Sequence, residues 1–223
     1  PATARDWFDR ALAVLLKGGG AAPVFTRSAA ELQADAWLGK AAMSRREAQE
    51  LNQRARSSDA ALDKTTRLAI LNKASDLLDR ALSEAVEATK RLPSAMSIGL
   101  EVVIESEKFL SFQPYLSKSE QAQYVAGIRT RAAQGLARFP NGEKIYGARG
   151  LLEFMIGDFN GALQDVNRAL SLNPANPDTI GLRVEVNAVL GNCDGARNDL
   201  RKVISEQRDD FLVNFFSKRC GTP

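Results

Sequence analysis

The sequence predicts an all-α protein whose C-terminal part is an α-α superhelical solenoid, a stack of helical hairpins. Apolar residues recur at helical spacing along most of the 223 residues, and alternating strand patterns are missing. Near the C-terminus, aligning the chain with itself at a shift of 34 residues pairs Gly157 with Gly191 and Ala162 with Ala196. A repeat of this period, made of two helices, is typical of a helix–turn–helix solenoid.

The N-terminal region is expected to contain a short helix followed by a long antiparallel helical hairpin. The short helix covers 5–16. Ser28 and Glu31 have the capping-box spacing that begins the first long helix. Asp59 is expected to cap the second long helix, which ends before Pro93.

The second long helix carries an apolar stripe with two interpretations. The residues of the stripe recur close to heptad spacing; they are Leu68, Leu71, Leu78, Leu82 and Val86. A run of only about three heptads favours packing within the chain, and a coiled-coil surface for self-association is the alternative.

The chain is expected to divide into three parts. Residues 1–93 form the N-terminal helical region, and 94–142 form a degenerate helix pair kinked near Pro114. Residues 143–223 contain two full repeats and a C-terminal capping helix over 209–218.

The repeat carries charged residues as well as small ones. The shift of 34 residues pairs Arg149 with Arg183 and Asp165 with Asp199. In each repeat the arginine lies on the first helix and the aspartate on the second. We therefore expect two structural ion pairs, Arg149 with Asp165 and Arg183 with Asp199, one across each hairpin.

The segment from Tyr146 to Pro174 (YGARGLLEFMIGDFNGALQDVNRALSLNP) resembles the tetratricopeptide repeat (TPR) family. The matching positions are Tyr146, Gly150, Gly157, Asp158, Phe159, Ala162, Val166, Ala169, Leu172, Asn173 and Pro174. Glu153 departs from the family, which prefers an aromatic residue there. The second copy, 177–210, matches less fully, and the resemblance does not extend to 1–93. It implies TPR-type helical hairpins.

The resemblance also implies a concave groove lined by the first helix of each repeat, where TPR proteins bind peptides or partner segments. The residues that it places in this partner-binding groove are Lys144, Leu151, Phe154, Met155, Asp178, Glu185, Ala188 and Val189. The alternative is that the N-terminal helices fill the apolar part of the groove.

The two cysteines lie at positions that a helical hairpin would bring together. Cys193 begins the second helix of the last repeat, and Cys220 follows the terminal helix. If these helices run antiparallel, their lengths nearly cancel and a Cys193–Cys220 disulfide is expected. A disulfide favours the bacterial periplasm or another exported location. Two unrelated thiols, and a cytoplasmic protein, are the alternative.

Composition restricts the chemistry. The chain has no His, so Ser-His-Asp and Cys-His catalysis and His metal ligands are excluded, and we expect no metal and no cofactor. Its net charge is +3 with the signs interleaved, which argues against a nucleic-acid partner. No apolar run is long enough for a transmembrane segment. The chain begins at Pro1 without Met, which is compatible with removal of a leader.

These patterns favour a non-enzymatic scaffold or adaptor that binds a protein or peptide in a bacterial cell-envelope or secretion-type assembly. The alternative is a cytoplasmic TPR adaptor or regulator with free thiols. A carboxylate-based enzyme is the third hypothesis, and the least favoured. Its candidates, Glu101 and Glu105, are expected on a solvated helix face instead.

Overall fold

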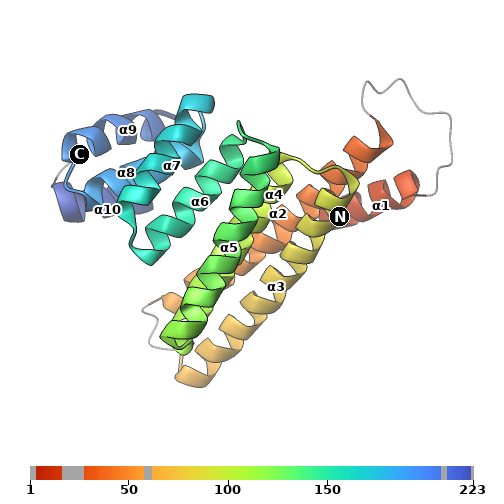
Figure 1. Ribbon diagram of the computed structural model, residues 1–223. Coiled ribbons are helices and arrows are strands. Elements are labelled where there is room, and N and C mark those ends of the chain that lie inside the picture. The colour runs from red at the N-terminus through yellow and green to blue at the C-terminus, as the bar shows by residue number, and fades with distance from the viewer. Residues whose placement is uncertain (1–3, 17–27, 58–61, 207–209, 222–223) are drawn as a thin grey trace. The chain divides into compact units, whose positions relative to one another are not determined.

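The computed structural model describes residues 4–16, 28–57, 62–206 and 210–221, and over these residues the chain is all-α without a strand (Figure 1). The helices are α1 (Ala4–Leu16), α2 (Ala29–Arg56), α3 (Lys64–Arg91), α4 (Ala95–Phe112), a 3-10 turn (Gln113–Tyr115), α5 (Lys118–Arg138), α6 (Glu143–Ile156), α7 (Phe159–Leu172), α8 (Pro177–Val189), α9 (Cys193–Glu206) and α10 (Asp210–Cys220).

The chain forms two compact units, Pro1–Tyr124 and Val125–Pro223. The boundary between them falls within α5. The boundaries predicted from the sequence lie after residues 93 and 142, where turn-forming residues separate the helices.

The long helices begin where side chains satisfy their free backbone N–H groups. Ser28 and Glu31 form the expected capping box at the start of α2. At the start of α3 the cap is Asp63, whose carboxylate accepts a hydrogen bond from Thr66 N at 2.7 Å. The expected cap, Asp59, lies outside the described residues, and α3 begins later than the sequence suggested.

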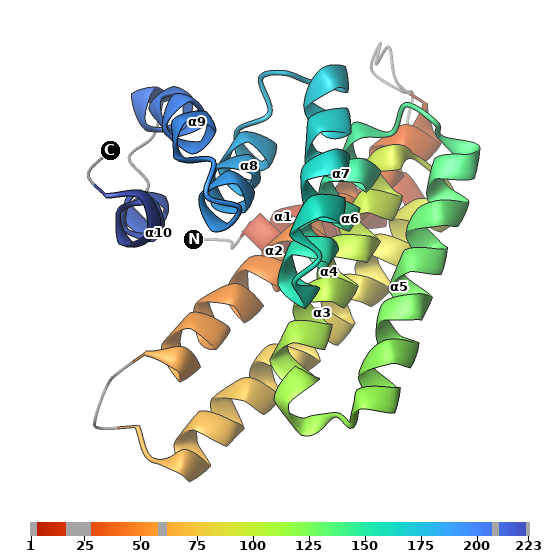
Figure 2. The ribbon, with the colours of Figure 1, turned by 60° about the vertical axis from the view of Figure 1, so that its left-hand side comes forward.

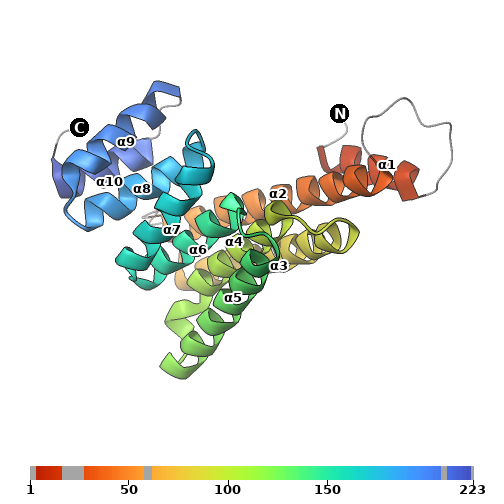
Figure 3. The ribbon, with the colours of Figure 1, turned by 45° about the horizontal axis from the view of Figure 1, so that its top comes forward.

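The first unit is built on the antiparallel pair of α2 and α3, which lie side by side in all three ribbon views (Figures 1–3). Their interface is rich in fully buried alanines, namely Ala41, Ala48, Ala74, Ala81 and Ala85, together with Leu77 and Leu78. Small side chains allow the two helix backbones to approach closely. The prediction that the apolar stripe of α3 packs within the chain is only partly correct, because Leu78 is buried but Leu68 is 48% exposed.

Helix α1 packs on α2 through polar contacts, which include an ion pair between Asp9 and Lys40 at 2.6 Å, and through one close apolar contact. Arg5 forms an ion pair with the buried Glu84 of α3 and donates a hydrogen bond to Ser44 Oγ at 2.9 Å. The ring of Phe8 lies directly over Gly39, where an added Cβ would be 2.3 Å from the ring. The buried carboxylate of Glu84 thus has a cation from a helix distant in the sequence.

The second unit contains the C-terminal part of α5 and two helical hairpins, α6 with α7 and α8 with α9, with α10 packed on α8 and α9 (Figure 2). Gly157 and Gly191 adopt the left-handed conformation, with φ of 88° and 77°. After each glycine, a side-chain oxygen accepts a backbone N–H: Asp158 from Gly161 and Asn192 from Gly195. The turn is therefore built in the same way in both hairpins.

Each hairpin of this unit has an arginine–aspartate ion pair between its two helices. Arg149 donates to both Asp165 oxygens at 2.6 Å. Arg183 donates to both Asp199 oxygens, at 2.6 and 2.9 Å. Both carboxylates are buried, with side chains 8% and 5% exposed. A buried carboxylate requires such a partner, because an unpaired charge is costly to remove from water.

A third arginine pair joins α5 to α6 and was not expected. Arg129 Nε donates to Glu153 Oε1 at 2.8 Å, and Glu153 is buried. Glu153 is the position where the sequence departs from the aromatic residue of the TPR pattern. The departure therefore has a physical reason in the contact with α5.

We predict that Arg149→Met lowers the free energy of unfolding by about 3 kcal/mol, because Asp165 stays buried without its cation. The measurement is urea unfolding followed by circular dichroism. The matched control is Arg201→Met on α9, where the arginine is exposed. The double variant Arg149→Met/Asp165→Leu should recover part of the loss. Equal stability of the two single variants would contradict the prediction.

The pair in the second hairpin should make stability depend on pH. Burial raises the pKa of Asp199, but hydrogen bonds and charge from Arg183 and Lys202 outweigh it and hold the pKa below its ordinary value of 3.8. A native pKa below the unfolded one means that the ionised carboxylate stabilises the fold at neutral pH. This contribution is lost as the pH falls from about 4 through the lowered native pKa.

We therefore predict that the stability difference between the wild type and Asp199→Asn is largest at neutral pH and shrinks on acidification below about pH 4. Urea unfolding of both proteins across the acid range measures this difference. A difference that stays constant with pH would show that the Asp199 charge does not contribute.

Candidate functional site

The first helix of the first hairpin, α6, carries four of the residues that the sequence analysis placed in a partner-binding groove. Leu151 and Phe154 are half-buried and pack against a core cluster of α7 and α8 residues that includes Val166, Ile180 and Val186. Met155 is also half-buried. Lys144 has a side chain that is 32% exposed and lies 3.7 Å from the carboxylate of Glu143. These side chains thus sit between core and surface.

The first helix of the second hairpin, α8, carries the other four. Asp178 is exposed, and Glu185 and Val189 are half-buried. Ala188 is only 4% exposed and packs in a core cluster with Leu200 and Phe216. Its side chain therefore belongs to the interior of the unit, because α10 covers this part of α8.

Helix α10 has a buried face and an exposed face. Leu212 and Phe216 are 2% and 0% exposed and pack against α8 and α9. Phe215 is half-buried, and Phe211 is 67% exposed. Phe211 therefore does not contribute to the packing of the predicted capping helix on the last repeat.

The exposed face of α10 continues onto α6 and α7 through ring contacts. The ring centroids of Phe211 and Phe215 lie 6.2 Å apart, those of Phe215 and Phe154 lie 6.4 Å apart, and those of Phe154 and Phe159 lie 5.7 Å apart. We refer to Phe154, Phe159, Phe211 and Phe215 as the aromatic strip. A phenylalanine of α10, Phe215, therefore lies next to Phe154 of α6.

A cation stacks on Phe215, which lies between Phe154 and Phe211 in the aromatic strip. The guanidinium carbon of Arg219 is 3.8 Å from the ring centroid of Phe215, which is stacking distance. Arg219 lies two turns after Phe211 on the same helix. The sequence signal for this arrangement is the spacing of Phe211, Phe215 and Arg219 at every fourth residue.

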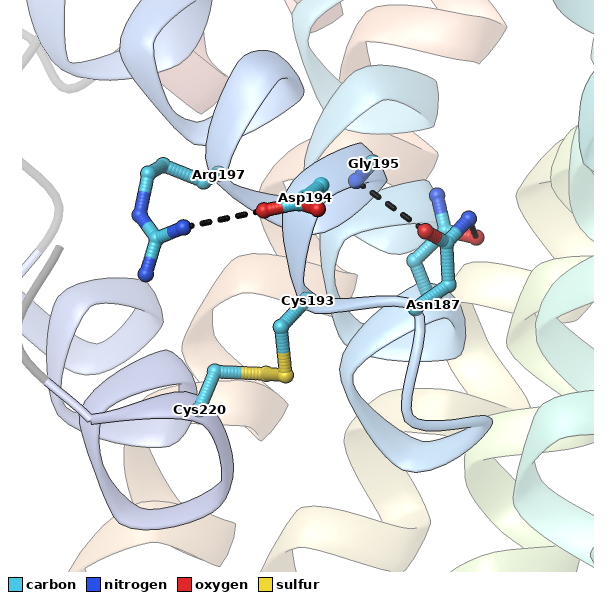
Figure 4. Close-up of a disulfide and its surroundings, with 7 residues drawn as sticks. Asn187, Cys193, Asp194, Gly195, Arg197 and Cys220 are labelled. Atoms are coloured by element: carbon cyan, nitrogen blue, oxygen red, sulfur yellow. Dashed lines mark hydrogen bonds and ion pairs between the residues drawn. A yellow bond between two sulfur atoms is a disulfide. The ribbon is translucent and has the colours of Figure 1, made fainter.

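A disulfide between Cys193 and Cys220 fixes the end of α10 (Figure 4). It joins the first residue of α9 to the last residue of α10, with the two Cα atoms 5.5 Å apart. Beside it, Asp194 forms an ion pair with Arg197 at 3.2 Å. The disulfide thus holds the C-terminal turn of α10, which carries Arg219, against the second hairpin.

The carboxylates considered for catalysis have a different environment from the one expected. Glu101 was expected on a solvated face, but it is 3% exposed and accepts a hydrogen bond from Thr89 Oγ1 of α3. The reason is that α4 packs on α3 at this position. Glu105 is half-buried. Among the described residues no group of three or more acidic or cysteine side chains could hold a metal ion.

In the described part of the chain, no helix has the length and apolar character needed to cross a membrane. The chain matches no protein-family model, and a search of curated proteins finds no match.

We predict that opening the disulfide lowers the free energy of unfolding by about 3.5 kcal/mol, from the chain entropy released by a cross-link of this span. The bond joins residues with a sequence separation of 27. The measurement is urea unfolding of the wild type with and without dithiothreitol, beside Cys220→Ser. The wild type should respond to the reductant and the variant should not. A wild type that ignores the reductant would contradict the prediction.

Proposed function

We propose that the chain is a non-enzymatic protein–protein interaction module of TPR type, a scaffold or adaptor in an exported cell-envelope or secretion-type assembly. Its second unit would bind a partner protein or peptide through the face formed by the first helices α6 and α8. Helix α10 would extend this face and end the stack.

The repetition of contacts in the two hairpins supports the TPR-type arrangement. The left-handed glycines, the capped turns after them and the arginine–aspartate pairs recur at the same positions of both hairpins. A stack assembled from equivalent hairpins presents equivalent helices on each side, which is how solenoid proteins build extended binding surfaces.

The observation that carries the binding proposal is the aromatic strip with its neighbours on α6. Phe211 is 67% exposed, Leu151 and Phe154 are half-buried against one core cluster, and Met155 on the same helix is also half-buried. Exposed apolar side chains that gather on one surface mark protein–protein contact sites, and aromatic residues are enriched among those that contribute most to binding.

The paired cysteines support the exported location. Disulfides persist in oxidising compartments and are rare in the cytoplasm. Alkylation of the protein in intact source cells, before lysis, distinguishes the two locations. Protected cysteines support the exported scaffold, and reactive thiols support the cytoplasmic adaptor.

We predict that Met155→Lys on α6 and Asp178→Lys on α8 each reduce partner recovery from source-cell extract at least about tenfold, because the first introduces a charge on the binding face and the second reverses one. The matched control is Gln164→Lys, an exposed position on the second helix α7. Recovery is measured by quantitative mass spectrometry, with folding checked by circular dichroism. If the control loses the partner and the two α6/α8 variants keep it, the proposed face is wrong.

A further inference from the structure

We propose that the aromatic strip and Arg219 together bind an acidic peptide segment in which a carboxylate lies next to an aromatic or aliphatic side chain. This inference rests on the proposed function and names the chemistry of the partner. It is carried by the arginine that stacks on Phe215 and by the exposure of the neighbouring Phe211.

The rings of α10 provide an apolar contact surface. Leu212 and Phe216 are the two α10 side chains that are almost fully buried against the second hairpin, and Val213 and Phe215 are partly buried against the same core. Phe211, at 67% exposed, adds nothing to that core. An exposed phenylalanine next to a half-buried one offers a contact area for an apolar side chain, and its burial by a partner would be favourable.

Arg219 provides a positive charge beside these rings. Arg219 stacks on Phe215, and no ion pair joins it to a described carboxylate. A guanidinium that stacks through its plane keeps its N–H donors in that plane, where they match the two oxygens of a carboxylate. The exposed Lys218 adds a second positive charge beside it. The surface around Arg219 is therefore complementary to an acidic group.

The rings and the cation of α10 are spaced so that one ligand can contact both. Phe211, Phe215 and Arg219 follow one another at every fourth residue, so they lie along one side of α10. A ligand that places an apolar side chain on the rings can thus reach Arg219 with a carboxylate a few residues away. The disulfide at Cys220 fixes the position of the adjacent Arg219, which lowers the ordering cost of binding.

A macromolecule with a phosphate backbone fits the same surface less well. Sustained binding of nucleic acid needs many basic side chains, and only Lys218 and Arg219 lie at this end of α10. Stacking of bases on the rings makes single-stranded DNA the relevant competitor. It therefore serves as an arm of the test.

The test is a selection of phage-displayed random dodecapeptides on the oxidised full chain, followed by sequencing and fluorescence anisotropy of synthetic hits. We expect hits that combine Asp or Glu with an aromatic or aliphatic residue. Arg219→Glu should weaken these hits at least about tenfold, because a carboxylate would meet a carboxylate. Phe211→Ala should weaken them as well. Arg219→Lys, which keeps the charge without the planar stack, should have a smaller effect than Arg219→Glu.

The control Arg201→Glu, an exposed arginine of α9, should leave the affinity unchanged. Hits that are basic or uncharged, hits insensitive to Arg219→Glu, or equally tight binding of a single-stranded oligothymidylate would overturn the inference. Hits that depend on Met155 and Asp178 but not on Phe211 and Arg219 would leave the proposed function standing and remove this inference. An absence of hits that depend on either set would overturn both.

Discussion

The structure depends on buried carboxylates that are held by arginines from a neighbouring helix. Four such pairs join different helices: Glu84 with Arg5, Glu153 with Arg129, Asp165 with Arg149 and Asp199 with Arg183. A fifth pair, between the half-buried Glu107 and Arg45, joins α4 to α2. A buried carboxylate that loses its cation is costly, whereas an apolar contact tolerates a small slide of one helix along another. The pairs therefore specify which helix faces meet, and at which register.

In the second unit, arginine–carboxylate pairs of this kind orient α6, the helix that carries part of the proposed binding surface. The pair of Arg129 and Glu153 orients α6 from one side, and the pair of Arg149 and Asp165 orients it from the other. Phe154 follows Glu153 on this helix, and its ring centroid lies 5.7 Å from that of Phe159 and 6.4 Å from that of Phe215. The disulfide fixes the end of α10, and the last turn of this helix carries Arg219. Together these contacts pre-organise the strip.

Features that repeat within the sequence were predictable from it. Gly157 and Gly191 recur at one spacing, as do the arginine and aspartate of each hairpin, and a coincidence in two copies identifies a structural role. The Cys193–Cys220 pairing was predictable because helix lengths alone return the chain to its starting point.

Features that depend on how separate elements meet were not predictable in this way. Glu101 is buried because Thr89 of α3 lies against it, and nothing in the spacing of α4 reveals that contact. Four apolar residues of α10 are close in sequence, and only the direction from which α8 and α9 approach decides that Leu212 and Phe216 are buried. Arg129 lies outside the recognisable repeat, so its partner Glu153 looked like a mere departure from the TPR pattern.

The central claim is that a partner lies on the α6, α8 and α10 side of the second unit. Site-specific photo-crosslinking in the source cells tests it most directly, with benzoylphenylalanine in place of Phe211 or Met155, and of Gln164 or Arg201 as controls on the second helices. We expect a discrete covalent adduct from benzoylphenylalanine at Phe211 or Met155, and none from the two control positions. Adducts formed only from Gln164 or Arg201 would contradict it.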